Sequence, residues 1–128
     1  MKQYTIKQAA QMSGTTVATL RYYEEAGLLQ NIQRLPNGHR RYNEQDLAWI
    51  DFIICLREGG MPIQQLKRYV DLCYMDGTEQ ARCYLLEKHR VALKAKIDSL
   101  QQQYDRIDDK IDWYHEQIAA LAASESSQ

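Results

Sequence analysis

The chain has 128 residues, of which 45% are hydrophobic and 26% are charged, with a formal net charge of -1. This composition is typical of one globular domain and excludes a disordered chain. No stretch approaches the roughly 18 apolar residues of a membrane span, and the N-terminus lacks the apolar core of a signal peptide. Three cysteines without a paired pattern favour a reducing compartment, so we expect a cytoplasmic protein with no membrane partner.

The net charge hides a division along the chain. Residues 1–42 carry six Lys or Arg and two Glu, a balance of +4, so residues 43–128 carry -5. A basic head on an acidic body is expected of a module that meets phosphate at one end only.

Two short helices are predicted at the N-terminus. Thr5–Gln8 is a capping-box pattern, which begins a first helix over about residues 5–13. A second helix is expected to begin at Thr15 or Thr16 and to end at Ala26, because glycine follows it. Two short helices joined by a tight turn that contains glycine are typical of a helix-turn-helix.

The strongest turn signal in the chain is Pro36–Gly38. Its Asn-Gly pair favours a type I′ hairpin turn, because both residue types tolerate positive φ. The flanking residues 32–35 and 39–42 are predicted to be short strands. A helix-turn-helix followed by a basic hairpin predicts a winged helix-turn-helix domain.

A third and a fourth helix are predicted after the hairpin. Asn43 caps the third, with Asp46 placed to favour the helix dipole, and Gly59–Gly60 ends it. Pro62 suits the first turn of the fourth helix. The apolar positions expected to pack are Leu47, Ile50, Ile54, either Leu56 or Arg57, Trp49 and Phe52 in the third helix, and Ile63, Leu66, Val70 and Cys73 in the fourth.

After a break at Asp76–Thr78, a long helix is predicted through about Ala122. Its apolar residues alternate spacings of four and three, which is a heptad pattern and indicates a coiled coil. These seam residues are Leu93, Ile97, Leu100, Tyr104, Ile107, Ile111, Tyr114, Ile118 and Leu121. A helix of about 45 residues is on the order of 65 Å long, and nothing else in the chain covers it. We therefore expect a second copy as partner, although the spacing does not set its direction.

The basic head is predicted to bind duplex DNA. Arginine reads guanine edges bidentately, and Thr and Tyr hydroxyls suit phosphate or base contacts. The expected contacts are Thr16, Thr19, Arg21 and Tyr22 on the second helix, and Arg34, Arg40 and Arg41 on the hairpin. A solvated basic surface is the simpler interpretation of the same residues. Tyr23 and Tyr42 have a spacing more typical of packing.

The cysteines and histidines form no evident site. Cys55 lies in an apolar stretch and is typical of a small buried residue. Cys73 and Cys83 lack metal-ligand spacing, so no metal or other cofactor is expected. No phosphate loop, nucleophile elbow or metalloprotease motif occurs, so an enzyme is not expected.

The chain resembles the MerR family of dimeric bacterial transcription regulators over almost its whole length. The matching segments are Tyr4–Ile6, Thr19–Glu24, Gly27–Leu29, Gly38–Tyr42, Asp46–Leu47, Phe52–Ile53, Leu56–Arg57 and Gly60–Met61. The resemblance implies a mostly α fold. Its parts are a winged helix-turn-helix DNA-binding domain over residues 1–76, wings at about 31–42 and 59–69, an antiparallel coiled-coil dimerisation helix over 77–122, and a flexible tail over 123–128. It also implies DNA contacts at Tyr42, Arg57 and Lys67.

The resemblance further implies a mechanism. Such dimers sit on a pseudo-palindromic promoter whose two elements are spaced too far apart for RNA polymerase. In the activated state they bend and untwist the DNA and realign the elements. We expect the same of this chain, with promoter DNA and RNA polymerase as partners.

The effector is expected from the branch of the family. Metal sensors have a cysteine at the start of the dimer helix, where this chain has Gln80, and drug sensors have a large C-terminal domain. The chain instead resembles the short NmlR/AdhR-like branch, linked to aldehyde and thiol stress, whose cysteine before Leu-Arg matches Cys55. The resemblance implies that Cys55 senses a thiol-reactive molecule, because an adduct there alters an apolar helix.

Two alternatives stay open. One is a zinc-dependent or other metal-responsive regulator using Cys73, Cys83 or His89. The other is a coiled-coil interaction protein whose basic head binds acidic partners instead of DNA.

Overall fold

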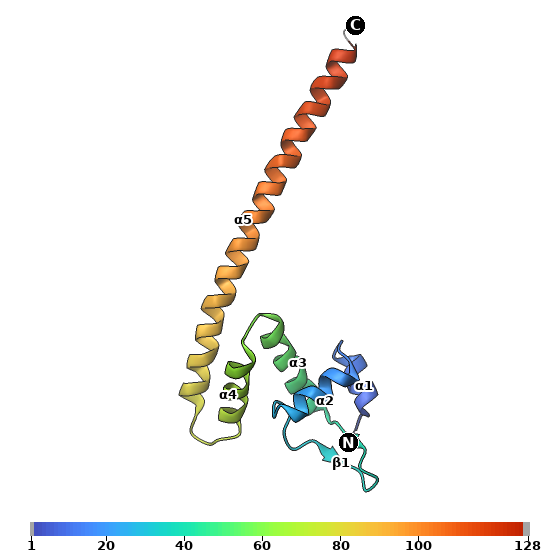
Figure 1. Ribbon diagram of the computed structural model, residues 1–128, viewed down its shortest axis with the longest axis vertical. Coiled ribbons are helices and arrows are strands. Elements are labelled where there is room, and N and C mark those ends of the chain that lie inside the picture. The colour runs from blue at the N-terminus through green and yellow to red at the C-terminus, as the bar shows by residue number, and fades with distance from the viewer. Residues whose placement is uncertain (1, 127–128) are drawn as a thin grey trace. The chain divides into compact units, whose positions relative to one another are not determined.

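The computed structural model describes residues 2–126, which form five helices and one two-stranded sheet (Figure 1). The elements in order are α1 (Ile6–Met12), α2 (Val17–Glu25), β1 (Gln33–Arg34), β2 (Arg40–Arg41), α3 (Glu44–Glu58), α4 (Ile63–Cys73) and α5 (Glu79–Ser126). The chain divides into two compact units, one that ends at His89 and one that begins at Arg90. This confirms the mostly helical fold expected from the sequence.

The helix-turn-helix forms as its capping residues predict. The Thr5 hydroxyl accepts a hydrogen bond from the backbone N–H of Gln8 at 3.1 Å, and the Gln8 side chain accepts one from Thr5 N–H at 2.9 Å. Thr16 caps α2 by accepting from the backbone N–H of Thr19 at 3.1 Å. These bonds satisfy amides that a helix leaves unpaired at its start.

The hairpin has the predicted position but a different turn. Gln33 pairs with Arg41 and Arg34 with Arg40, which leaves a three-residue loop beyond the Leu35–His39 pair. Gly38 has φ of +89° while Asn37 does not have positive φ, so the predicted type I′ turn is wrong. A type I turn followed by a left-handed glycine is the usual geometry of a three-residue hairpin loop.

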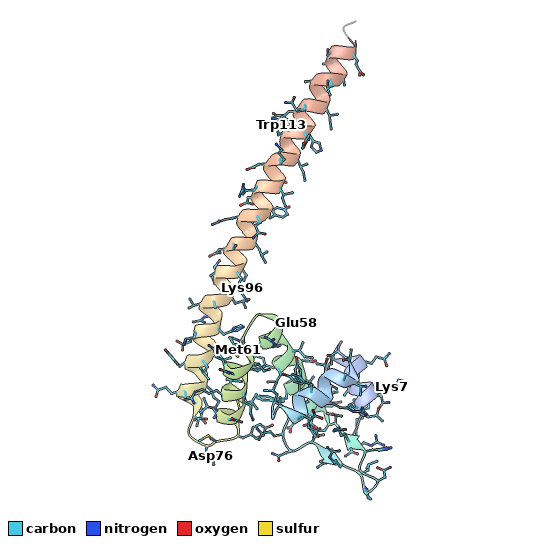
Figure 2. All side chains as sticks on the ribbon, in the orientation of Figure 1. Lys7, Glu58, Met61, Asp76, Lys96 and Trp113 are labelled. Atoms are coloured by element: carbon cyan, nitrogen blue, oxygen red, sulfur yellow. The ribbon has the colours of Figure 1, made fainter. Side chains whose placement is uncertain are left out.

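Helices α3 and α4 supply much of the core. Asn43 and Asp46 form a reciprocal capping box at the start of α3. The buried side of α3 differs from the expected one, because Ile53 is fully buried whereas Phe52 is exposed. Met61, between α3 and α4, is fully buried and anchors the turn between them (Figure 2).

One hydrophobic core joins α1 to α4. Its buried members are Ala9, Ala10, Leu20, Tyr23, Leu28, Leu29, Tyr42, Ile50, Ile53, Leu56, Met61, Leu66, Tyr69 and Val70. Trp49 packs beside this core, and its indole N–H donates to the carbonyl of Leu28 at 3.0 Å. This bond fixes the segment between α2 and the hairpin against α3, so the core positions both parts of the basic head.

Helix α5 begins in the first compact unit and continues through the second. Leu85 and Leu86 pack against the core, whereas no residue of the helix is fully buried. The helix is 48 residues long and reaches Ser126. The helix thus extends four residues beyond its predicted end at Ala122, into the segment expected to be a flexible tail, whose last two residues lie outside the described ones. Within residues 2–126, no helix is both long and apolar enough to cross a membrane.

Candidate nucleic-acid interface

Helix α2 has a buried face and an exposed polar face. Leu20 and Tyr23 are buried, and they share one face because positions three apart lie on the same side of a helix. Arg21 is exposed, and Tyr22 is 52% exposed. Helix α2 therefore presents a polar surface of the kind expected of a recognition helix.

The two threonines predicted as contacts are partly engaged. The Thr16 hydroxyl caps α2 and also donates to the Thr19 hydroxyl at 2.9 Å. Thr16 is exposed and Thr19 is half-buried. The hydroxyl pair lies at the start of the helix, where it holds the first turn in place.

A hollow of about 260 Å³ lies between α2 and the hairpin. It is lined by Thr5, Ile6, Arg21, Gly38, His39, Arg40 and Arg41. The three arginines come from α2 and β2, and no acidic side chain lines the hollow. A concave site walled by guanidinium groups suits a phosphate oxygen, which takes paired hydrogen bonds from arginine.

Glu24 links α2 to the hairpin. Its Oε1 accepts from Arg34 Nη2 at 2.6 Å, and its Oε2 accepts from Arg40 Nε at 2.8 Å. The hydrogen bond to Glu24 raises the pKa of Arg40 above its usual value. Two of the arginines predicted to bind DNA are therefore ion-paired within the chain, which the charge pattern alone did not indicate.

The other two arginines of the hollow differ from this pair. Neither Arg21 nor Arg41 forms an ion pair within residues 2–126. The structure thus brings Arg21, Arg40 and Arg41 together as predicted and separates them into paired and unpaired cations.

Two cations predicted to contact DNA at or beside the second wing also have partners. Arg57 Nη1 donates to the carbonyl of Met61 at 3.2 Å. Lys67 Nζ lies 3.4 Å from a carboxylate oxygen of Asp71, and a Cβ on Gly27 would overlap the ammonium group. Gly27 follows α2 with φ of +81°, so Lys67 of α4 lies against the segment that ends α2.

Tyr42 is a core residue, and the prediction that it contacts DNA is wrong. Its side chain is fully buried, and its hydroxyl has no hydrogen-bond partner among the described residues. Burial raises its pKa. The backbone of Tyr42 pairs instead with Tyr4 through hydrogen bonds of 2.8 and 2.9 Å, which tie the start of the chain to the hairpin. Sequence reasoning missed this role of Tyr4.

Cys55 does not have the buried position that its apolar neighbours suggested. It is exposed, on the last turns of α3, and its carbonyl accepts from Gly59 N–H at 3.0 Å. The His89 imidazole lies against Gly59, one helical turn beyond Cys55. Position 55 is therefore accessible in the single chain.

The remaining cysteines are separated. Cys73 lines a hollow of about 290 Å³ with Trp49 and Tyr74, and, after burial, it contributes to raising the pKa of Tyr69. Cys83 is exposed and lies 3.0 Å from a carboxylate oxygen of Glu87. Within the part of the chain that the structure describes, no group of three or more His, Cys, Asp or Glu is arranged to hold a metal.

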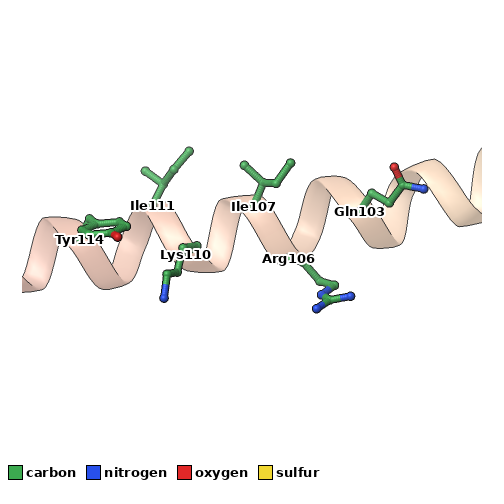
Figure 3. Close-up of a pocket in the computed structure, with 6 residues that line it drawn as sticks. All are labelled: Gln103, Arg106, Ile107, Lys110, Ile111 and Tyr114. Atoms are coloured by element: carbon green, nitrogen blue, oxygen red, sulfur yellow. The ribbon is translucent and has the colours of Figure 1, made fainter.

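The seam of α5 is largely exposed. Leu93 is half-buried, whereas the other predicted seam residues are between 47% and 66% exposed. Ile107 and Ile111 project from one side of the helix, and Arg106 and Lys110 from another (Figure 3). Among residues 2–126, nothing covers this apolar row.

Charge is also polarised along α5. Residues 79–97 carry five Lys or Arg and two Glu, a net charge of +3. Residues 98–126 carry two Lys or Arg and seven Asp or Glu, a net charge of -5. The two ends of the helix therefore have opposite signs.

The fold and the basic hollow define a winged helix-turn-helix DNA-binding protein, and comparisons with known proteins specify the family. Residues 4–73 match the MerR HTH family regulatory protein model. The chain is 43% identical to the HTH-type transcriptional regulator AdhR of Bacillus subtilis over 69% of this chain and 64% of that protein.

Two solved structures are similar over most of their length. One is HiNmlR, a MerR family regulator lacking the sensor domain, bound to promoter DNA, with a TM-score of 0.81, 32% identity, and coverage of 90% of this chain and 92% of that one. The other is a MerR family transcriptional regulator described as putative, from Listeria monocytogenes, with a TM-score of 0.81, 41% identity, and coverage of 87% and 85%.

The chain belongs to the MerR family of helix-turn-helix transcriptional regulators. Proteins of this family regulate transcription and are not enzymes.

Proposed function

We propose that the chain is a homodimeric regulator that binds a pseudo-palindromic promoter and distorts it to activate transcription. The observation that carries DNA binding is the hollow where Arg21, Arg40 and Arg41 meet beside the exposed face of α2. Phosphate groups that enter this hollow would fix the register of α2 in the major groove. HiNmlR supports the proposal, because it was crystallised on promoter DNA and lacks a sensor domain.

The proposed partner for α5 is a second copy in the antiparallel direction. The exposed seam requires an apolar cover, and an identical helix supplies the same spacing. A parallel copy would place like charges together along the helix, whereas an antiparallel copy places the +3 segment beside the -5 segment. Charge therefore favours the antiparallel direction, which the heptad spacing leaves open.

Two-fold symmetry connects the dimer to the promoter. Each protomer would offer one α2 and one hairpin, so the site reads as two half-sites. Activation would follow from distortion of an overlong spacer between the promoter elements, which realigns them for RNA polymerase. The energy for this deformation comes from protein–phosphate contacts that form only on the bent duplex.

The proposed signal is a thiol-reactive electrophile, aldehyde or oxidant that acts at Cys55. The exposed thiol permits attack, and the similarity to AdhR over the segment that contains Cys55 supports this branch of the family. With an aldehyde, the sulfur bonds to the carbonyl carbon, and the thiol proton passes to the carbonyl oxygen to give a hemithioacetal. The adduct adds polar bulk one turn from the Gly59–His89 contact, which gives it a route from α3 to α5.

DNA binding is tested with Arg21→Ala on the duplex upstream of the protein's own coding region. Loss of one bidentate contact is expected to weaken binding roughly 5- to 150-fold. Arg90→Ala removes the same charge from α5 and is the matched control. Equal effects of the two substitutions in a footprinting titration would exclude α2 as the recognition helix.

The effector is tested with Cys55→Ala in a promoter reporter exposed to formaldehyde, a thiol-reactive quinone or a peroxide. Induction is expected to be lost, whereas DNA binding without the inducer persists. Cys83→Ala removes another exposed thiol and should respond like the unaltered protein. Induction that survives in the Cys55 variant would refute sensing at this residue and leave the DNA-binding proposal standing.

A further inference from the structure

Glu24 occupies a special place in the basic head. Both of its carboxylate oxygens are used, one by Arg34 at 2.6 Å and the other by Arg40 at 2.8 Å. Its side chain is only 18% exposed, so water competes weakly for these oxygens. Arg34 also donates from Nη1 to the carbonyl of Gly38 at 3.1 Å, which extends the connection to the tip of the hairpin.

The ion pairs divide the arginines of the interface into two sets. Arg34 and Arg40 share one carboxylate, so the three groups together carry a single positive charge instead of two. Arg21 and Arg41 keep their full charge, because neither has an acidic partner within residues 2–126. The difference concerns phosphate contacts, since a phosphate that approaches Arg34 or Arg40 meets a guanidinium whose charge Glu24 partly neutralises and whose orientation Glu24 holds.

We propose that Glu24 is a specificity-determining residue that restrains Arg34 and Arg40 from indiscriminate contact with DNA. This inference rests on the proposed function, because it presupposes that the basic head binds duplex DNA. On unrelated sequences the restraint lowers affinity, since those complexes depend on the number of phosphates neutralised. At a matching site the hairpin is already held against α2 by the same carboxylate, and the arginines reach phosphate in a fixed position.

The physical basis is the origin of non-specific binding. A protein that neutralises a phosphate releases counterions, and each contact changes the slope of log affinity against log salt by about -0.9. The non-specific sites of a genome outnumber the specific one, so the ratio of the two affinities decides occupancy. Because Glu24 restrains two arginines, it raises the ratio of specific to non-specific affinity without contacting any nucleobase.

The test is Glu24→Gln, which keeps the shape of the side chain and removes its charge. On a mixed-sequence duplex, we expect roughly five- to tenfold tighter binding and a salt slope steeper by about 0.9 to 1.8, as one or two arginines are released. Glu25→Gln is the matched control, because Glu25 is the next residue of α2, is exposed and forms no ion pair within residues 2–126. Equal slopes for the two variants would overturn the inference.

A double-mutant cycle assigns the effect. Arg34→Gln should reduce the salt slope more in the Glu24→Gln background than in the unaltered protein, because only there is Arg34 free of the carboxylate. Equal reductions in both backgrounds would overturn the inference. If Glu24→Gln does not fold, Glu24→Asp replaces it, because the shorter side chain cannot reach both arginines at once.

The outcome for the unaltered protein separates the two proposals. If the unaltered protein shows no salt-dependent binding to any duplex, including the best sequence obtained by in vitro selection for binding, the proposed function is refuted. Normal binding with a reduced slope in Glu24→Gln would instead overturn only the inference on Glu24. A fall in the ratio of selected to mixed-sequence affinity, seen for Glu24→Gln and not for Glu25→Gln, is the expected result.

Discussion

The first compact unit, which ends at His89 (hereafter the compact unit), and the C-terminal half of α5 place the same kind of side chain in opposite environments. In the compact unit, Ile50 and Ile53 are fully buried, because α1 to α4 cover one another. In α5, Ile107 and Ile111 repeat at helical spacing but are 63% and 47% exposed. Apolar residues at helical spacing therefore identify a face that favours burial. Whether other helices of the same chain bury that face depends on the tertiary structure.

The largest expected effect comes from a change to the α5 seam. Ile107→Glu combined with Ile111→Glu should abolish the proposed dimer, because each buried isoleucine contributes about 1.5–3 kcal/mol and the new charges would be desolvated. Analytical ultracentrifugation would report a monomer, whereas the compact unit should keep its helical circular dichroism signal.

The matched control places the same charges on another face of the helix. Ala95→Glu combined with Gln102→Glu lies outside the seam, and both positions are exposed. This variant should sediment like the unaltered protein. If it dissociates as well, the seam is not the interface, and the comparison between the two regions fails.

The next largest effect is expected in the core. Ile53→Ala should lower the free energy of unfolding by about 2–5 kcal/mol, through lost burial and the cavity left behind. Met12→Ala, at a side chain that is 58% exposed, should change it by about 0.5 kcal/mol or less. Urea unfolding measures both, and similar losses for the two variants would contradict the assignment of the core.

A smaller effect depends on pH. Burial raises the pKa of Tyr69 to about 12, against an ordinary value of 10.0. Below pH 10 both folded and unfolded states hold this proton. As pH rises from 10 towards 12, the unfolded state releases it first, so the stability that the neutral tyrosine contributes is lost progressively.

Tyr69→Phe should therefore make stability fall less steeply between pH 10 and 12, as measured by urea unfolding at several pH values. Some dependence should remain, because burial also raises the pKa of Tyr23. An unchanged slope in the variant would show that Tyr69 does not titrate in the way its burial indicates.

The contrast between the two regions also shows where sequence reasoning succeeds. Helix starts were predicted correctly at Thr5 and Asn43, and Thr16 is one of the two caps predicted for α2, because capping depends on residues within one turn. The long helix α5 was also predicted correctly, because its apolar residues repeat at helical spacing without interruption.

Other features required the tertiary structure. Helix α3 has five apolar residues in a row around Ile53, so spacing alone did not distinguish its buried side from the side that exposes Cys55. Glu24 pairs with arginines ten and sixteen residues away, which no local pattern indicates. The turn at Asn37 depended on the strand register, which added one residue to the loop.

The smallest expected effect concerns Tyr42, where a polar atom lies in the core. Its hydroxyl is buried without a hydrogen-bond partner among the described residues. Substitution of phenylalanine removes only the unpaired hydroxyl, which eliminates its desolvation cost and leaves the packed ring in place. Tyr42→Phe should therefore leave stability unchanged or raise it by about 1 kcal/mol in urea unfolding at pH 7. Tyr69→Phe is the useful contrast, because the Tyr69 hydroxyl is not a buried group without a partner among the described residues, so its removal should be neutral or destabilising. A clear loss of stability for Tyr42→Phe would mean that the hydroxyl has a bonding partner, such as a buried water, and that the core beneath the hairpin is more polar than the contrast with α5 implies.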